Sequence, residues 1–266
     1  MEKDSALFPS IPASTVRAAR ALYGRGNLYL RLGDRLNHLA SDFDQKNLLS
    51  HLGGNKTALL TVLTIIQYVE KLTDAELAES IQGRIDLRYA LHLATPSPRI
   101  DPHTLCIFRS RIMTDPQCHI LFEEVFKTIY PEITSAAMKE ELKIDDVLNS
   151  ICEKEVCASL MGAMLNSMEA LSANHSKWLR GIALPHWYQR YNRSVVATSP
   201  DGSICKGEVS REEIEADIQN LLSEIRESNS DDIMELRETK KLHLIWDRLT
   251  DPNTSKNCHQ CIITIH

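Results

Sequence analysis

Apolar residues in the first half of the chain recur at the spacing of short amphipathic helices. In residues 57–71 they fall on one face of a helix with 3.6 residues per turn, which predicts a buried helix too short to span a bilayer. Thr73 and Glu76 have the spacing of a capping box, so a second helix is expected to begin there and to end at Gly83. Residues 86–91 predict a third, short helix before a proline-rich break.

A fourth helix is expected to begin after Asp101, which is a favoured N-cap residue, with Pro102 at the first helical position. The residues predicted to face the core are Leu105, Phe108 and Ile112. Arg109 and Arg111 are therefore expected on the outer side of this helix, outside the apolar stripe.

The rest of the chain also favours helices. Further helices are predicted at residues 13–23, 116–129, 153–174, 211–227 and 233–249. The first of these is expected to bury Val16, Ala19 and Leu22. A second helix is expected to begin in residues 27–40, and the alternative, from the alternation of Leu28, Leu30 and Leu32, is a short extended piece before Gly33. Residues 142–151 fit either a short strand entering a helix or one continuous helix. The pattern as a whole predicts a mainly α protein.

The composition is that of an ordinary globular protein, with 43% hydrophobic and 25% charged residues. No signal segment opens the chain and no apolar run reaches transmembrane length, so a cytoplasmic protein without a membrane partner is expected. The seven scattered cysteines argue against a disulfide framework. Cys258 and Cys261 form one C-x-x-C pair without a second ligand pair for zinc, and residues 251–266 are expected to form a disordered tail.

Charge is distributed unevenly along the chain. The formal net charge of −6 alone argues against a nucleic-acid partner. However, residues 15–40 contain five arginines and one aspartate, a local charge of +4, and residues 84–113 contain five arginines and two aspartates, a local charge of +3. Residues 201–250 contain thirteen acids and seven bases, which gives −6. A DNA-binding surface is therefore expected in the front half of the chain.

Several segments resemble one known family. The sequence LTDAELAESIQGRIDLRYALHL, followed by DPHTLCIFRSRI, resembles the N-terminal domain of InsH-type DDE transposases of bacterial insertion sequences. The shared pattern is a capped helix, a basic turn leading to Tyr89, Ala90 and Leu91, and a T-L-x-x-F-R-x-R helix at residues 104–111. IPASTVRAARALYGRGNLYLRLGDRL and WLRGIALPHWYQRY resemble one branch of the same family, so the likeness covers residues 9–250.

The resemblance implies a particular chemistry. DDE transposases use three carboxylates to hold two divalent metal ions across the scissile phosphate. In the resembling family the first aspartate opens a strand of an RNase H-like fold, and the matching region here offers Asp145 or Asp146 as that metal-binding, catalytic residue. The threonine and histidine that flank the family's aspartate are absent here, and the alternative is that both aspartates form the solvated N-terminus of a helix.

The same resemblance implies a catalytically incomplete chain. The family's second aspartate and its glutamate lie beyond a helical insertion, and this chain ends near that insertion's end, so a truncated transposase is expected. Mg²⁺ is implied for the intact enzyme and no cofactor for this chain alone. The expected organisation is a helical bundle with a helix-turn-helix-like DNA-binding part at residues 1–135, then an incomplete RNase H-like start with an entry strand and a helical insertion at residues 136–250.

The expected partner is double-stranded DNA at terminal inverted repeats, with pairing of two copies into a homodimer as a further implication of the resemblance. The residues expected to contact DNA are Arg17, Arg20, Arg84, Arg88, Thr104, Arg109 and Arg111. Arginines on a short, well-capped helix can contact phosphates or guanine edges as a recognition helix does. The alternative is a helical interaction or regulatory protein without nucleic-acid chemistry, which would bind a protein through its acidic C-terminal helices.

Overall fold

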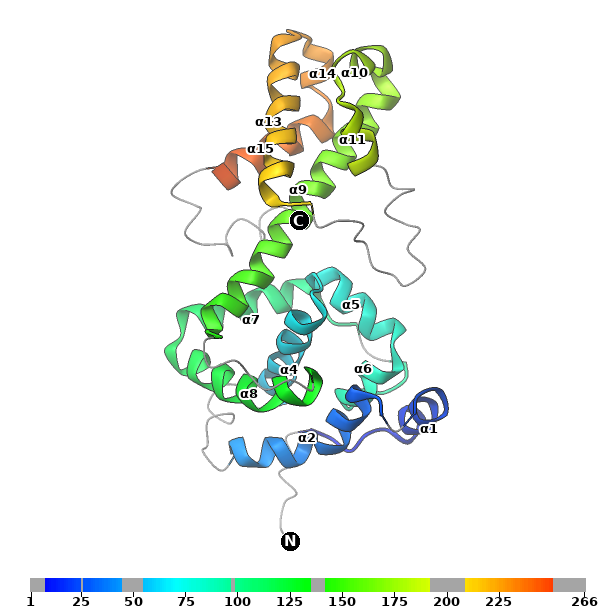
Figure 1. Cartoon of the computed structure of the whole chain (residues 1–266), viewed down its shortest axis with the longest axis vertical. Helices are drawn as coiled ribbons and strands as arrows, with labels where there is room; N and C mark the ends of the chain where they lie inside the picture. The colour runs from blue at the N-terminus through cyan, green and yellow to red at the C-terminus, as the bar shows by residue number, and fades with distance from the viewer. Residues whose placement is uncertain are drawn as a thin grey trace. The chain divides into compact units, whose positions relative to one another are not determined.

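The structure is a computed structural model, and it describes residues 8–24, 26–44, 55–96, 99–134, 142–191 and 209–250. Within these ranges the regular elements are all helices, as the sequence predicts, and no strand occurs. The chain divides into two compact units, Met1–Lys154 and Glu155–His266, which are described separately below (Figure 1). The predicted tail at residues 251–266, with Cys258 and Cys261, lies outside the described residues.

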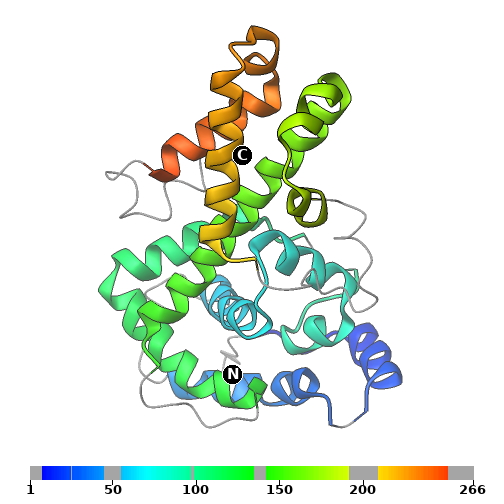
Figure 2. The same cartoon turned by 45° about the horizontal axis from the view of Figure 1, so that its top comes forward.

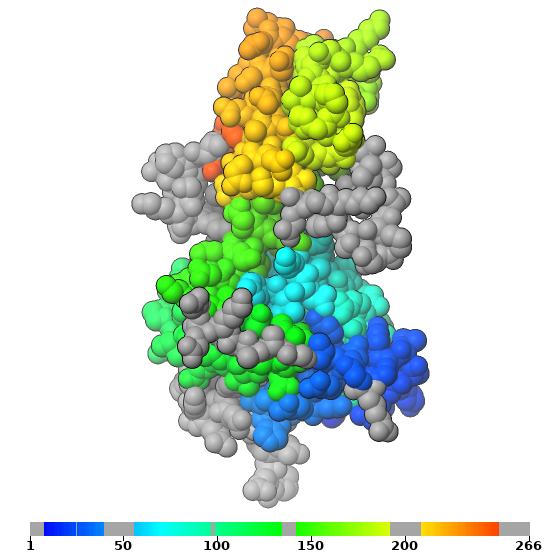
Figure 3. Space-filling view, viewed as in Figure 1, coloured from blue at the N-terminus to red at the C-terminus, as the bar shows by residue number. Residues whose placement is uncertain are grey.

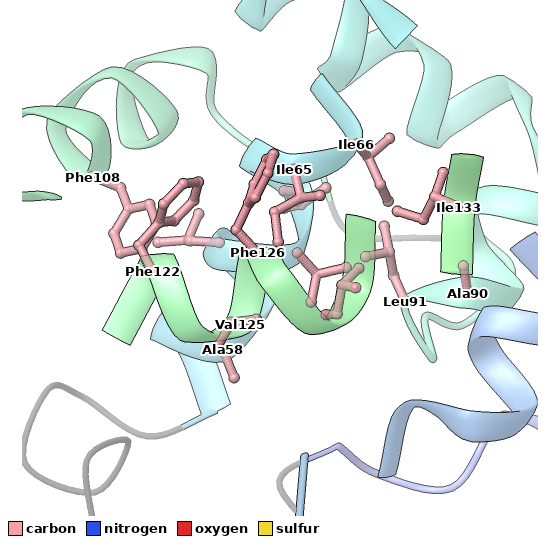
Figure 4. Close-up of a cluster of buried hydrophobic side chains, with 14 of the residues drawn as sticks. Ala58, Ile65, Ile66, Ala90, Leu91, Phe108, Phe122, Val125, Phe126 and Ile133 are labelled. Atoms are coloured by element: carbon pink, nitrogen blue, oxygen red, sulfur yellow. The ribbon is translucent and has the colours of Figure 1, made fainter. Parts of the chain in front are cut away.

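The first unit is a bundle of helices around α4. Its helices are α1 (Ala13–Leu22), α2 (Leu28–Asp44), α4 (Asn55–Glu70), α5 (Asp74–Gly83), α6 (Ile85–Ala90), α7 (Pro102–Thr114), α8 (Pro116–Thr134) and the start of α9 (Ile144–Asn174). Helix α8 packs against α2, α4 and α7, and α6 packs against α1, α2 and α5. In Figure 4, Phe122 and Phe126 of α8 lie beside Phe108 of α7 and Ile65 of α4. Each such buried side chain contributes about 1.5–3 kcal/mol through removal of apolar surface from water.

The predicted helix starts at Thr73 and Asp101 are confirmed. The Thr73 side chain accepts from the Glu76 backbone N–H and the Glu76 carboxylate accepts from the Thr73 N–H, which completes the capping box of α5. The Asp101 carboxylate accepts from the His103 N–H at 3.1 Å, with Pro102 at the first position of α7. Both caps satisfy backbone donors that a helix leaves unpaired at its N-terminus.

The helix expected in residues 27–40 is confirmed as α2, which begins at Leu28, and the alternative of an extended piece at Leu28–Leu32 is wrong. The alternation of leucines conceals a helical stripe, and the residues of that stripe are Tyr29, Leu32, Leu36 and Leu39, all buried. Gly33 lies on the same side, where α2 meets the backbone of α6. A Cβ atom at Gly33 would lie 2.7 Å from the Tyr89 carbonyl oxygen and 3.1 Å from Ala90 Cα, so only glycine permits this approach.

Two smaller predictions also fail. Leu22, expected inside, is 69% exposed, whereas Ala19 is fully buried and Val16 partly buried. The helix expected to stop before Pro131 instead continues through it to Thr134. A proline within a helix removes one backbone hydrogen bond, and the burial of Ile133 in the core of the first unit favours continuation.

The second unit contains the rest of α9 together with α10 (Ser176–Ile182), α11 (Pro185–Arg190), α13 (Arg211–Glu227), α14 (Asp231–Met234) and α15 (Arg237–Thr250). Its core combines the α9 stripe from Val156 to Leu171 with the predicted stripe of α13 from Ile214 to Ile225. A second capping box begins α13, where Ser210 and Glu213 exchange the same two hydrogen bonds as the box of α5. The predicted helix at residues 233–249 is observed as two pieces, α14 and α15.

Residues 144–151 are helical and form the first turns of α9. Of the two alternatives for this region, the continuous helix is the one observed, and the expected entry strand is not. Ile144, Val147 and Leu148 explain the choice, because their three- and four-residue spacing places all of them in the core of the first unit. In the described part of the chain, no helix has both the length and the apolarity needed to cross a membrane.

Candidate nucleic-acid interface

The exposed sides of α1 and α2 carry four arginines. Arg17 and Arg20 are three residues apart on α1, and Arg31 and Arg35 are four residues apart on α2, so each pair shares a helix face. All four are exposed, and α1 lies at the surface of the first unit (Figure 3, blue). We call these four residues the α1–α2 basic face. The four side chains are thus at the surface of the first unit, where Arg35 pairs with Glu132 at 2.6 Å, and the DNA-binding role of this segment stays a prediction.

Asp34 lies within the α1–α2 basic face and connects three helices. Its carboxylate accepts from the Tyr89 hydroxyl of α6 at 2.5 Å and from an Arg20 guanidinium nitrogen at 3.4 Å. Arg20 also donates to the Tyr89 hydroxyl at 3.0 Å, and these contacts with Tyr89 and Asp34 raise the pKa of Arg20. Because Arg20 and Asp34 are both more than half exposed, the ion pair contributes little stability and leaves the guanidinium accessible.

Arg109 is buried, so its expected position outside the apolar stripe is wrong. Its side chain has 0% exposure and donates to both Asp74 carboxylate oxygens, at 2.5 and 2.7 Å, and to the Gln67 side-chain oxygen at 3.0 Å. Arg109 lies four residues after Leu105 and three before Ile112, which places it on the buried side of α7. The residue therefore connects α7 to α4 and α5, and it presents no surface to a ligand.

Arg88 is also buried, and it does not offer the expected phosphate contact. Its Nε donates to the Ile81 carbonyl oxygen at 2.7 Å. That carbonyl belongs to the last turn of α5, where the helix leaves its acceptors without intrahelical partners. Arg88 thus completes the C-terminal end of α5.

Arg84 is about one-third exposed and is held by two acids. It donates to Glu70 at 2.9 Å and to the buried Asp86 at 3.0 and 3.2 Å, and its guanidinium carbon lies 5.1 Å from the centre of the Tyr29 ring. Burial alone would lower the pKa of Arg84, but hydrogen bonds to the two carboxylates raise it overall. Its position fits a connection between α2, α4 and α6 better than a free phosphate contact.

Arg111 and Thr104 lie on the outer side of α7. Arg111 is exposed, with its Nε 3.8 Å from the Asp115 carboxylate, and Thr104 is partly exposed at the third position of the helix. Ile107 between them is 51% exposed. The outer side of α7 therefore offers a cation, a hydroxyl and an apolar side chain, which are the group types that read base edges in a DNA groove.

Asp145 and Asp146 are exposed at the N-terminus of α9. Asp145 is 71% exposed and lies 3.3 Å from Nε2 of His119 on α8. The residues that the structure describes contain no cluster of three His, Cys, Asp or Glu side chains able to hold a metal ion. The surroundings of these two aspartates therefore do not fit a two-metal site, and they match the alternative of a solvated helix N-terminus, which the helix dipole stabilises.

The second unit contains a buried carboxylate that the sequence did not reveal. Asp217 of α13 accepts from Nε2 of His186 at 3.0 Å, Nε1 of Trp187 at 2.8 Å and the Tyr191 hydroxyl at 2.8 Å, and it pairs with Arg190. Burial opposes ionisation, yet the four donors lower the pKa of Asp217 below its ordinary value. One signal was available, because Asp217 lies on the apolar stripe of α13, three residues after Ile214.

Comparison with known proteins supports a relationship for part of the first unit. No curated protein and no solved structure matches the chain. Residues 29–111, which run from α2 to α7, match a family model described as a transposase domain (DUF772). This match covers Arg84, Arg88, Thr104, Arg109 and Arg111, whereas Arg17 and Arg20 lie outside it. Residues 29–111 are thus similar to a transposase domain, which supports a transposase family for this chain.

Proposed function

We propose that the first unit binds double-stranded DNA as the N-terminal part of an InsH-type transposase. The observation that carries the proposal is the α1–α2 basic face, whose four arginines are exposed and of which Arg31 and Arg35 lie within the segment similar to a transposase domain. Arg20 pairs with Asp34 and Arg35 with Glu132 at the surface of the unit. Exposed arginines contact phosphates irrespective of sequence and fix the register of a protein on the duplex. The terminal inverted repeats of the transposon are the proposed target.

Within this proposal, α7 has the role of a base-reading helix. The buried hydrogen bonds of Arg109 to Asp74 and Gln67 fix the orientation of α7. Because they join α7 to α5 and α4, they restrict both rotation and translation of α7. Thr104, Ile107 and Arg111 then remain on the outer side. Arg109 is thus a positioning residue, whereas Arg111 is the residue assigned to contact DNA.

A salt titration tests DNA binding. The affinity of the purified chain for duplex DNA is measured over a range of salt concentrations, together with the double variant Arg17→Gln, Arg31→Gln. Each lost phosphate contact reduces the slope of log K against log salt by about 0.9, so the double variant is expected to lose about 1.8. The control Lys127→Gln, Lys143→Gln removes the same charge from exposed positions elsewhere in the first unit and is expected to change the slope little.

An equal loss of slope in the variant and its control would contradict the assignment of the α1–α2 basic face. Absence of any binding at low salt would contradict the function, and would favour the alternative of a protein-binding regulator. That alternative draws support from residues 201–250, whose thirteen acids and seven bases make the C-terminal helices acidic. Competition between duplexes with and without the repeat sequence tests the proposed target.

We further propose that this chain by itself does not cleave DNA. Support comes from the exposed position of Asp145 and Asp146 and from the absence, within the described residues, of a cluster of three His, Cys, Asp or Glu side chains able to hold a metal ion. Incubation of the chain with supercoiled plasmid and Mg²⁺ is expected to give no nicking. Nicking that disappears in Asp145→Ala or Asp146→Ala would show that a metal site forms after all.

A further inference from the structure

The longest stretch of the chain without an acidic residue lies in the second unit. Residues 170–200 contain no aspartate or glutamate and carry Lys177, Arg180, Arg190 and Arg193. The next longest, residues 5–33, belongs to the first unit and supplies Arg17, Arg20 and Arg31 of the α1–α2 basic face. The second unit is otherwise acidic, so residues 170–200 stand out as its positively charged segment.

Helix α10 presents two of these cations to solvent. Lys177 and Arg180 are exposed and three residues apart, so they lie on one side of the helix. The Arg180 Nε donates to the Ser176 carbonyl oxygen of its own helix at 3.2 Å, a hydrogen bond that lies at the exposed surface. No acid lies within seven residues of either cation along the sequence.

Helix α11 and its N-cap residue add an aromatic and an apolar side chain. Tyr188 of α11 is 45% exposed, and Leu184, the N-cap of the helix, is 39% exposed. Large side chains of this kind are usually buried, as Trp187 and Tyr191 of the same segment are. Figure 3 shows α10 and α11 at the surface of the second unit.

Asp217 explains why this side of α11 stays exposed. It binds His186, Trp187, Arg190 and Tyr191, and these hydrogen bonds join α11 to α13. Figure 2 shows α9, α11 and α13 together in the second unit. Arg190 also donates to Glu213 at 2.9 Å, so its charge is compensated within the unit. In the described part of this segment, residues 170–191, the exposed cations are those of α10, and the exposed tyrosine is Tyr188.

We propose that Lys177, Arg180 and Tyr188 form a second nucleic-acid contact surface, separate from the α1–α2 basic face. The two cations bind backbone phosphates, and the Tyr188 ring stacks on a base, with Leu184 covering its apolar edge. Exposed cations together with an exposed aromatic ring, here within twelve residues of one another in the sequence, are the groups by which proteins bind strands whose bases are accessible. The inference takes its class of partner from the proposed function but uses different residues.

The test compares two double variants of the full chain, Lys177→Gln, Arg180→Gln in the second unit and Arg17→Gln, Arg31→Gln in the first. Binding to a single-stranded oligonucleotide and to a duplex of the same length is measured over a range of salt. The second-unit variant is expected to reduce the salt slope for the single strand by about 1.4, at about 0.7 per phosphate contact. Tyr188→Ala is expected to weaken single-strand binding about fivefold or more, whereas Tyr188→Phe, which keeps the ring, is expected to bind like the parent chain.

The control is Lys240→Gln, Lys241→Gln, which removes the same charge from exposed positions on α15. If this control lowers the slope as much as Lys177→Gln, Arg180→Gln does, the second surface is overturned. If only the first-unit variant weakens binding, the second surface is overturned and the proposed function stands. If only the second-unit variant weakens binding, the assignment of the α1–α2 basic face is overturned and the second surface stands. Absence of binding to either nucleic acid overturns both, and equal affinity for polyglutamate overturns the assignment of a nucleic acid as partner.

Discussion

The two units each bury one carboxylate that joins helices, but they build its surroundings differently. Asp74 of the first unit meets a single guanidinium from α7, that of Arg109, together with Gln67 of α4. Asp217 of the second unit collects four donors from α11 and the residue after it. In the first unit the buried carboxylate is bound by an arginine, Arg109, from a basic segment, whereas in the second unit several side chains of α11 bind it. An arginine in a basic segment is therefore not necessarily exposed.

The largest effect is expected from Arg109→Met, which leaves the Asp74 carboxylate buried without its cation. Removal of one partner from a buried ion pair costs about 3–5 kcal/mol of unfolding free energy. All three tryptophans lie in the second unit, so circular dichroism and hydrogen exchange in α4, α5 and α7 report the loss. Arg111→Met, two residues away and exposed, is the control and is expected to change stability by about 0.5 kcal/mol or less.

The double variant Asp74→Leu, Arg109→Met sharpens this result. Replacement of both members of a buried pair by apolar side chains is often neutral. The buried Gln67 loses its hydrogen bonds to both residues, so only part of the lost stability is expected to return. If the double variant is as unstable as the single one, the pair is not the main connection between α5 and α7.

Asp217→Ala is expected to destabilise the second unit by about 3 kcal/mol, because it leaves the buried Trp187 and Tyr191 donors without their acceptor. Trp187 donates directly to the lost carboxylate, so tryptophan fluorescence during urea unfolding measures the change. Glu215→Ala removes an acid from the same helix whose partner is Arg211 at 2.6 Å, and it is expected to cost about 0.3–0.5 kcal/mol. Similar losses in both variants would contradict a special role of Asp217.

The lowered pKa of Asp217 also gives a pH dependence. The unfolded chain binds the proton with a pKa of about 3.9, above that of the folded state. The stabilisation by Asp217 is therefore fully present above about pH 5 and is lost as the pH falls through the folded-state pKa. Acid unfolding followed by tryptophan fluorescence is expected to lose this pH-dependent component in Asp217→Ala.

A smaller effect is expected from Gly33→Ala, where the new methyl group meets the backbone of α6 at 2.7 Å. Overpacking of this kind costs about 1–3 kcal/mol. Gly162→Ala on α9 is the matched control in the second unit, because its Cβ has no atom within 4 Å, and it is expected to stabilise that unit by about 0.5–1 kcal/mol. Thermal unfolding of the two variants should therefore shift in opposite directions.

The smallest effects concern the two capping boxes, one in each unit. Thr73→Ala and Ser210→Ala each remove one side-chain acceptor and are expected to cost about 1 kcal/mol. Thr73 is buried, whereas the hydrogen bonds of Ser210 are exposed and water can replace them, so the loss is expected to be larger at Thr73. Urea unfolding of both variants tests this order, and a larger loss at Ser210 would reverse it.

The sequence predicted where helices begin better than it predicted which helices pack against one another. The box at Thr73 and the N-cap Asp101, which the sequence predicted, involve residues two or three positions apart, so a short stretch contains the whole interaction. The box at Ser210 has the same local spacing but was not predicted. The extended piece at Leu28 failed because an alternating leucine pattern and a helical stripe share residues, and only packing against α6 and α8 selects the helix. The predicted DNA contacts of Arg88 and Arg109 failed for a similar reason. Both side chains are buried because their hydrogen-bond acceptors lie on other helices.

The sequence by itself determined that this is a helical protein with basic segments in the front and acidic helices at the end, because periodicity, caps and charge are local properties. Tertiary structure alone decided which cations remain available to a ligand. Asp74 lies 35 residues before Arg109, and Asp217 lies 30 residues after Trp187, so no local pattern pairs them. Burial of a charge requires a specific partner, and only the packed fold brings that partner within hydrogen-bonding distance.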